Sequence, residues 1–347
     1  MDQPEFIETE RQTTCAVCGS GGIEAYRDLQ DAIFGAPGTW SFSRCTRAGC
    51  DTYWLDPRPT ASDIGKAYVR YYTHTKPGEA SLRSRLVHIL AVENAARRFG
   101  FASHRLAGPL AVCAAALTAA YPGLRPHLDL LVRYLPSSQM GAGRLLDVGC
   151  GDGQALAILR DLGWTVTGLD TDERAIASAV ARGLDVIQGT LIESRFPDQT
   201  FDAVVSSHVI EHVHDPRAFL AESRRILREG GRLVAVTPNV RAYSHARHGR
   251  YWRGLEPPRH LTLFSQSGLK RLATAAGLLD VAVTPTARAV ALTEIASAVV
   301  RECGHYDEDR WPGLPIWMRA QVEQWRAQSR LHRSSESGNE LLLTAQR

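Results

Sequence analysis

Four of the seven cysteines lie within the first fifty residues, as the pair Cys15 and Cys18 and the pair Cys45 and Cys50. A C-x2-C turn directs two thiolates at one point, and a second pair can complete a tetrahedron around Zn²⁺. The opening segment MDQPEFIETERQ is acidic and polar, so we expect no secretory signal and a reducing, cytoplasmic location in which disulfides are disfavoured. The spacing predicts a structural zinc site with four protein ligands; the alternative is four ordinary reduced thiols.

A glycine-rich loop follows an apolar segment in the sequence LLDVGCGDG. Its glycines, Gly149, Gly151 and Gly153, let the backbone turn sharply and let a ligand approach main-chain atoms closely. Asp170 ends the next apolar segment, a position from which a carboxylate can accept hydrogen bonds from both hydroxyls of a ribose. The dinucleotide-binding motif G-x-G-x-x-G needs glycine or alanine where this chain has Gln154. The pattern therefore indicates a ribose-containing ligand but departs from the dinucleotide motif.

The elements that must position these residues alternate regularly from Gly143 onward. Apolar strand-like segments are expected at 144–148, 164–170, 184–189, 203–207 and 231–238, and helices at 154–162, 172–182 and 216–227. Repeated units with apolar strands imply a parallel sheet covered by helices on both faces. Ligands of such sheets bind at the carboxyl ends of the strands, so the loops at that edge should carry function.

Four segments resemble, in order, the successive motifs of class I S-adenosylmethionine-dependent methyltransferases, and most nearly those of the ubiquinone-pathway O-methyltransferases. The segments are LLDVGCGDG, GLD, FPDQTFDAVVSSHVIEHVHDP and LREGGRLVAVTPN, and the resemblance covers about residues 140–285. It implies an α/β fold with a Rossmann-like seven-stranded sheet and helices on both faces, in which the last ten residues insert as an antiparallel strand beside the sixth. The cysteine pairs look like a zinc-ribbon extension found on some bacterial members.

The resemblance also implies how S-adenosylmethionine would be held. Asp147 and the glycine loop would hold its amino-acid end, and Asp170 its ribose. The loop after the third strand would flank the adenine, although many members carry an acidic residue where this chain has Thr190. Two residues after the fourth strand would lie beside the methionine portion. The implied cofactor-binding residues are Asp147, Gly149, Cys150, Gly151 and Gly153, then Asp170, Thr190 and Leu191, and last Ser206 and His208.

Methyl transfer to an oxygen needs an aligned acceptor and usually a base that removes its proton, a role in which histidine suits neutral pH. We predict His260 and His212 as catalytic. His260 lies in WRGLEPPRHLTLFS, where related enzymes contact substrate; the alternative is a histidine bonded within a tight loop. His212 shares a helical face with His208 and Glu211, where some ubiquinone-pathway relatives bind a divalent cation; helix capping and cofactor contacts are the alternatives. Further substrate-pocket candidates are Tyr243, Trp252, Glu256 and Arg259.

Three regions are expected along the chain. They are a zinc-ribbon-like module at 1–60, a helical linker or cap at 61–138, and the methyltransferase domain at 139–347 with a helical insertion at about 287–330. The insertion contains three tryptophans, at 311, 317 and 325, which we expect to pack as the core of a cap over the pocket.

The linker contains an apolar segment, 106–121, that is shorter than the ~20 residues needed to cross a bilayer. We therefore expect no transmembrane span there. A buried core helix is the favoured interpretation. A lid over an apolar substrate and a peripheral contact with a membrane surface are the alternatives.

Together these patterns predict an S-adenosylmethionine-dependent methyltransferase that acts on a small-molecule acceptor, with oxygen as the favoured atom. The acceptor classes considered are a sugar, a glycan, a lipid or quinone, and a natural-product intermediate. The net charge of +3 gives no general reason to expect nucleic acid as a partner. An RNA methyltransferase is the first alternative, but residues 1–60 carry five arginines against nine carboxylates. An inactive cofactor-binding scaffold is the second. The oligomeric state is not predicted.

Overall fold

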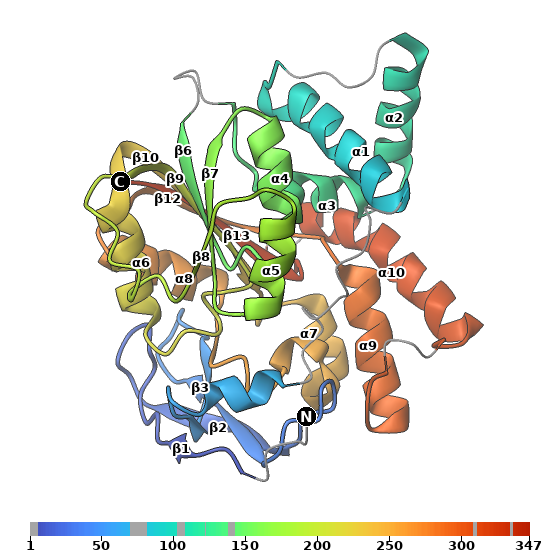
Figure 1. Ribbon diagram of the computed structural model, residues 1–347. Coiled ribbons are helices and arrows are strands. Elements are labelled where there is room, and N and C mark those ends of the chain that lie inside the picture. Colours follow the sequence, from blue (N-terminus) through green and yellow to red (C-terminus); the bar gives the residue numbers. More distant parts are fainter. Residues whose placement is uncertain are drawn as a thin grey trace.

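A seven-stranded sheet forms the centre of the protein (Figure 1). Its strands, in spatial order, are β12 (Leu279–Thr286), β13 (Glu340–Gln346), β10 (Leu227–Pro238), β9 (Phe201–Ser207), β6 (Arg144–Val148), β7 (Thr165–Asp170) and β8 (Val186–Gln188). The terminal strand β13 runs antiparallel to both neighbours, and the pairs from β10 to β8 are parallel. The computed structural model describes residues 6–69, 82–102, 108–121, 123–137, 143–307, 311–333 and 336–347. The predicted α/β fold, with its last strand beside the sixth, is confirmed.

Helices cover both faces of this sheet, and the strand sequences explain why (Figure 1). Leu145 and Leu146 are neighbours in β6, yet successive strand residues point to opposite faces, so they enter different cores. The helices over one face are α4 (Gln154–Asp161) and α5 (Glu173–Ala181), and those over the other are α6 (Pro216–Ile226) and α8 (Gln266–Ala275). Because β6, β7, β9 and β10 are parallel, their carboxyl ends lie along one edge of the sheet.

The N-terminal module is a small antiparallel sheet that includes a strand from much later in the chain. Its strands, in spatial order, are β11 (Thr262–Leu263), β4 (Tyr53–Leu55), β3 (Trp40–Cys45) and β2 (Gly22–Leu29), while β1 (Thr9–Glu10) pairs separately with β5 (Arg58–Pro59). In β11, Thr262 lies opposite Trp54. A short 3-10 helix, η1 (Ile64–Tyr68), follows the module. The predicted boundary at residue 60 thus leaves out one strand of the module's sheet.

The segment after the module is helical, as predicted, but one of its helices is not buried. The helices are α1 (Leu82–Phe99), α2 (Gly108–Ala120) and α3 (Leu124–Leu131). In α2, Leu110 is 66% exposed and Val112 is 65% exposed. The favoured interpretation of 106–121 as a buried core helix is wrong for α2, because Ala114 is its one buried side chain among those that the structure describes. Positions 106 and 107, and the predicted boundary at 138/139, lie outside the described residues.

The predicted insertion contains two helices, α9 (Val290–Cys303) and α10 (Leu314–Arg333), which pack on each other and on α7 (Tyr243–His248). Its tryptophans are not core: Trp311 is 63% exposed and Trp325 is 61% exposed, and Trp317 is also exposed. The prediction fails because α10 packs through small and polar side chains, among them Ala327, rather than through its aromatic face. Among the helices that the structure describes, none is long and apolar enough to cross a membrane.

Candidate functional site at the carboxyl edge of the sheet

The glycine loop runs from the carboxyl end of β6 to the start of α4. Gly149 has φ of 71°, and a Cβ added there would lie 2.4 Å from Val209, so the position requires glycine. Gly151 has φ of 56°, and a Cβ there would meet no atom within 4 Å, so its backbone faces open space. The Gly151 N–H donates to Asp170 Oδ2 at 2.8 Å. The structure therefore brings together the loop and the carboxylate that the sequence singles out.

Two buried polar atoms beside this loop have no hydrogen-bond partner among the described residues. They are Oδ1 of Asp147 in β6 and Oγ of Ser206 in β9. The other oxygen of Asp147 accepts a hydrogen bond from Arg133 Nη2 at 2.7 Å. Burial raises the pKa of the Asp147 carboxyl, and Arg133 opposes that shift. Because buried polar atoms normally have partners, Asp147 and Ser206 fit a bound ligand that supplies them, such as the amino-acid end of S-adenosylmethionine.

The loop after β8 carries the residues predicted beside the adenine. The carboxylate of Glu193 accepts hydrogen bonds from Thr190 Oγ1 at 2.6 Å and from Thr190 N at 3.2 Å. An acidic group therefore lies at this turn, although position 190 itself is not acidic. Leu191 is buried. Cys150 points into the core, since a Cβ on Gly168 would lie 2.7 Å from its sulfur, and burial raises the pKa of its thiol.

His208, predicted beside the methionine portion of the cofactor, lies in a network of charged groups. Its Nδ1 is 3.1 Å from Glu211 Oε1, and its Nε2 is 3.1 Å from Glu340 Oε1 at the start of β13. Burial would lower the pKa of His208, but the two carboxylates raise it to about 9. Arg288 pairs with the same Glu340. The network joins the loop after β9 to the terminal strand, and a cofactor contact of His208 stays a prediction.

The two histidines predicted as catalytic, His212 and His260, lie side by side with ring centroids 4.9 Å apart. Each Nδ1 lies beside a backbone carbonyl, that of Arg259 at 3.0 Å for His212 and that of Gly254 at 2.8 Å for His260. A carbonyl can only accept, so Nδ1 carries the proton and the neutral ring has its lone pair on Nε2. Burial lowers the pKa of His260 to about 4. The buried ring of His260 is therefore neutral near pH 7.

Glu211, fully buried, completes a group of three possible ligands with these histidines. One ligand atom from each of Glu211, His212 and His260 lies within 4.8 Å of the other two. Two imidazoles and one carboxylate can hold a divalent transition metal. This set differs from the sequence candidate of His208, Glu211 and His212, because His208 is directed between Glu211 and Glu340.

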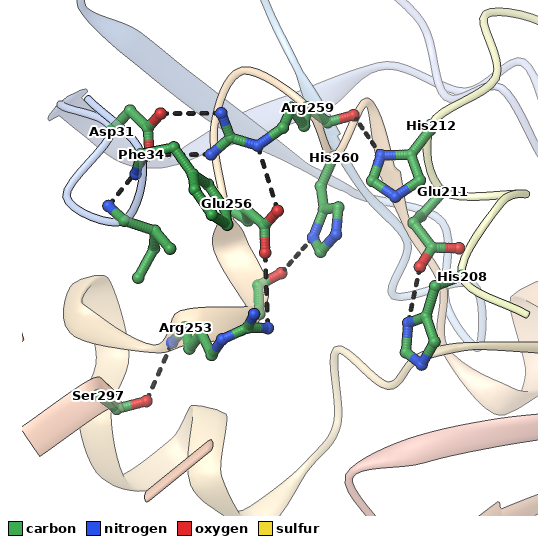
Figure 2. A network of polar contacts seen from close by, with 12 residues as sticks. Asp31, Phe34, His208, Glu211, His212, Arg253, Glu256, Arg259, His260 and Ser297 are labelled. Atoms are coloured by element: carbon green, nitrogen blue, oxygen red, sulfur yellow. Dashed lines mark hydrogen bonds and ion pairs between the residues drawn. The ribbon is translucent and has the colours of Figure 1, made fainter. Parts of the chain in front are cut away.

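A buried ion network behind the histidines reaches into the N-terminal module (Figure 2). The guanidinium of Arg259 donates to both oxygens of Asp31, at 2.8 and 2.9 Å, and to Glu256 Oε1 at 3.1 Å. It also donates to the carbonyl of Ala67 at 2.9 Å and lies 4.4 Å from the centre of the Phe34 ring. Burial would raise the pKa of Glu256, but attraction to the His260 ring in its protonated form, and to Arg253 and Arg259, lowers it to about 2. Glu256 and Arg259, predicted to line a substrate pocket, are buried and paired with each other, and Glu256 also lines a small cavity beside Trp252.

The two other pocket candidates also have protein partners. Trp252 is buried and stacks on His245 with ring centroids 4.5 Å apart. The Tyr243 ring lies 3.7 Å from the guanidinium carbon of Arg330. A cavity of about 440 Å³ lies nearby, between the N-terminal module and the loop after β10, with His245 in its wall. Its other lining residues include Tyr26, Arg44, Asp51, Tyr53 and Arg241.

The four N-terminal cysteines converge as predicted, and their sulfurs all lie within 4.8 Å of one another. The Sγ atoms of Cys15 and Cys50 are 3.8 Å apart, and those of Cys18 and Cys45 are 3.4 Å apart. A tetrahedral zinc with bonds of about 2.3 Å separates its sulfurs by about 3.8 Å. All four are free thiols. The donor set and its spacing therefore fit a zinc ion.

Comparison with known proteins agrees with the geometry at the carboxyl edge of the large sheet. Residues 122–283 match the model of the methyltransferase domain family. Over these residues the chain is similar to a methyltransferase domain. The match includes the glycine loop, Asp170, Ser206 and both predicted catalytic histidines, and it ends inside β12.

The methyltransferase domain is similar to curated proteins of bacteria and of man. A probable S-adenosylmethionine-dependent methyltransferase of Mycolicibacterium smegmatis is 40% identical over 30% of this chain and 42% of its own length. One from Mycobacterium tuberculosis is 33% identical over 46% of this chain and 56% of its own length. The human mitochondrial ubiquinone biosynthesis O-methyltransferase is 35% identical over 34% of this chain and 36% of its own length. The chain thus spans about half or less of the curated relatives' length.

Several residues around the site of the methyltransferase domain escape sequence reasoning. Arg133 contacts Asp147 from α3's C-terminal end, Tyr68 Oη lies 3.1 Å from His212 Nδ1, and Asp31 is 228 positions away from its partner Arg259. Arginine and aspartate are common surface residues, so composition gives no signal for these contacts. A charged residue within an apolar run is the one available signal, and Arg133 follows LDLLV.

Proposed function

We propose that the protein transfers a methyl group from S-adenosylmethionine to an oxygen of a small-molecule acceptor. The observation that carries the proposal is the convergence of the open glycine loop, Asp170 and the two partnerless atoms of Asp147 and Ser206 at one edge of the sheet. When bound, S-adenosylmethionine supplies an electrophilic methyl group. A sugar, a glycan, a lipid or quinone, or a natural-product intermediate are the acceptor classes within this proposal.

The residues at the carboxyl edge bind and orient the cofactor in this proposal. Asp147 Oδ1 accepts from the amino group, and Ser206 Oγ bonds beside it. Each oxygen of Asp170 already accepts one backbone N–H, from Gly151 and from Asp172, and keeps a lone pair for a ribose hydroxyl. Glu193 supplies the acidic group for the adenine edge that position 190 lacks. The loop backbone at Gly149, Gly151 and Gly153 allows the close approach.

His212 and His260 serve the acceptor. The lone pair on Nε2 of a neutral ring would accept the proton of the acceptor hydroxyl, and bound S-adenosylmethionine would supply the methyl group to that oxygen, leaving as S-adenosylhomocysteine. Because burial keeps the pKa of His260 near 4, its ring is neutral at pH 7 and ready to accept. Glu211, buried beside both rings, then stabilises the imidazolium that forms.

The four cysteines hold a structural zinc in this proposal. Because thiolates occupy all four coordination positions of the zinc ion, no position remains for water. The ion would therefore stabilise the fold of the module and would have no catalytic role. Free thiolates persist in a reducing compartment, which supports a cytoplasmic location.

The glycine loop offers a clean test. We expect Gly151→Val to abolish S-adenosylmethionine binding measured by calorimetry, because its side chain would occupy the open space beside Asp170. Gly230→Val is the matched control: its φ is 71°, and a Cβ there also meets nothing within 4 Å, but it lies in β10 away from the edge. Equal binding by both variants would refute the cofactor assignment. Candidate acceptors are then screened for a product heavier by one methyl group; methylation of RNA alone would refute the acceptor class.

A further inference from the structure

Helix α10 presents an apolar stripe to the outside of the protein. Leu314, Met318, Val322 and Trp325 recur every three or four residues, so they share one helix face, and all four are exposed. Trp317 and Trp311 are exposed beside this stripe, and their rings lie 6.3 Å apart. Monomeric soluble proteins rarely leave such a continuous group uncovered, so the stripe indicates a contact surface.

The exposed charged side chains of α10 are arginines. Arg319 and Arg326 are exposed next to the stripe. Within the described part of 311–333, the one acidic residue is Glu323, which is buried and pairs with Arg247, Arg330 and, at 3.6 Å, the exposed Arg326. The exposed face of α10 is therefore apolar and aromatic with an arginine border.

Helix α2 adds a second exposed apolar surface, and it carries no charged residue. Leu110, Val112 and Leu117 of α2 are exposed, as is Tyr121 just after it. The start of α3, which follows α2, packs on the buried side of α10, because a Cβ on Gly123 would lie 2.9 Å from the buried Gln324. Figure 1 shows the two helices on the same side of the protein.

We propose that the exposed faces of α10 and α2, the lipid-binding face, dock on a membrane surface that contains anionic lipids. Tryptophan prefers the boundary between headgroups and acyl chains, and an apolar helix face bordered by arginines is the pattern of helices that lie in that boundary. The arginines match the negative charge of anionic headgroups. A second copy of the chain fits less well, because two such faces packed on a twofold axis would bring the arginines of each α10 together without an exposed acid on the helix to pair with them. This inference does not depend on the proposed methyl transfer.

The test is co-sedimentation of the full-length protein with vesicles of phosphatidylcholine alone and of phosphatidylcholine mixed with phosphatidylglycerol. We expect binding to the mixed vesicles, and binding should weaken as salt rises because salt screens the arginines. The double variant Met318→Ser, Trp325→Ser should bind at least about tenfold more weakly, since two apolar side chains leave the membrane. Arg319→Ser with Arg326→Ser should remove the preference for the anionic vesicles.

The control is Ile23→Ser, because Ile23 is 61% exposed but lies in β2 of the N-terminal module. It should bind vesicles like the unaltered protein. Failure of the unaltered protein to bind mixed vesicles, or equal binding by the Met318, Trp325 variant, would overturn the proposal. Light scattering tests the alternative that a second copy of the chain covers the face. If the unaltered protein is a dimer that does not bind vesicles, and the Met318, Trp325 variant is a monomer, the face belongs to a second copy. Far-UV circular dichroism shows that each variant keeps its helices.

Discussion

The pair of Asp31 and Arg259 gives the sharpest prediction of the structure. Both side chains are fully buried, and Asp31 also accepts hydrogen bonds from three backbone N–H groups of its own turn, at 33, 34 and 36. Asp31→Asn keeps the shape but removes the charge. Arg259 would then remain buried with Glu256 as its one carboxylate partner among the described residues.

The expected cost follows from that burial. Removing one partner of a buried ion pair costs about 3–5 kcal/mol, because the other charge stays desolvated without compensation. The contact joins the N-terminal module to the loop that carries His260, and the Arg259 carbonyl accepts the His212 Nδ1–H. We therefore expect Asp31→Asn to lower acceptor turnover as well. The affinity for S-adenosylmethionine, which is expected to bind at β6 and β7, should change by no more than about twofold, because no described contact of Asp31 reaches those strands.

Urea unfolding followed by tryptophan fluorescence measures the stability change. Asp198→Asn is the control, because Asp198 also pairs with an arginine, Arg225, but is 69% exposed, and exposed pairs contribute about 1 kcal/mol or less. Replacing both buried partners, as Asp31→Asn with Arg259→Met, should recover part of the loss. If Asp31→Asn costs no more than Asp198→Asn, the buried network does not hold the module in place and the reasoning fails.

Two further predictions concern the metal and the base. Elemental analysis should find close to one zinc per chain, lost in Cys15→Ser with Cys18→Ser and kept in Cys113→Ser, whose thiol is exposed elsewhere; iron, or no metal, would contradict the zinc site. As a base, His260 works only when neutral, so its protonation removes activity as the pH falls through about 4 rather than near its ordinary value of 6.5. A fall of kcat/KM below about pH 6.5 that is absent in the His260→Ala variant would contradict the lowered pKa of His260.

The sheet and its cofactor edge could be predicted because their signals are local. The strands β6, β9 and β10 contain apolar runs, and two of the helices begin after a capping aspartate, Asp172 before α5 and Asp215 before α6. The glycine loop and Asp170 follow strands directly, so chain order alone brings them to one edge. The same holds for the paired cysteines, whose spacing already fixes two thiolates per turn.

The other features of the fold and the site depend on which helices and strands pack against one another. The sequence carries no local signal for that packing. Strand β11 has two residues and pairs with a strand some two hundred positions earlier, so no periodicity reveals it. The tryptophans of the insertion were expected in the core because aromatic residues usually bury their area, but α10 turns its small residues toward α9. In α2, an apolar composition favours burial but also fits a contact with lipid, and only the packing separates the two.

The N-terminal module fixes both sides of the loop that carries His260. Before this residue, Asp31 and the Ala67 carbonyl hold Arg259; after it, β11 pairs with β4, and Ser265 Oγ, which caps α8, donates to the carbonyl of Cys50. Cys50 is also one of the four converging thiols. A zinc ion there would therefore set the position of the predicted acceptor histidines through backbone contacts, while the cofactor loop between β6 and α4 rests on the large sheet. Metal loss should consequently impair acceptor turnover before it impairs cofactor binding.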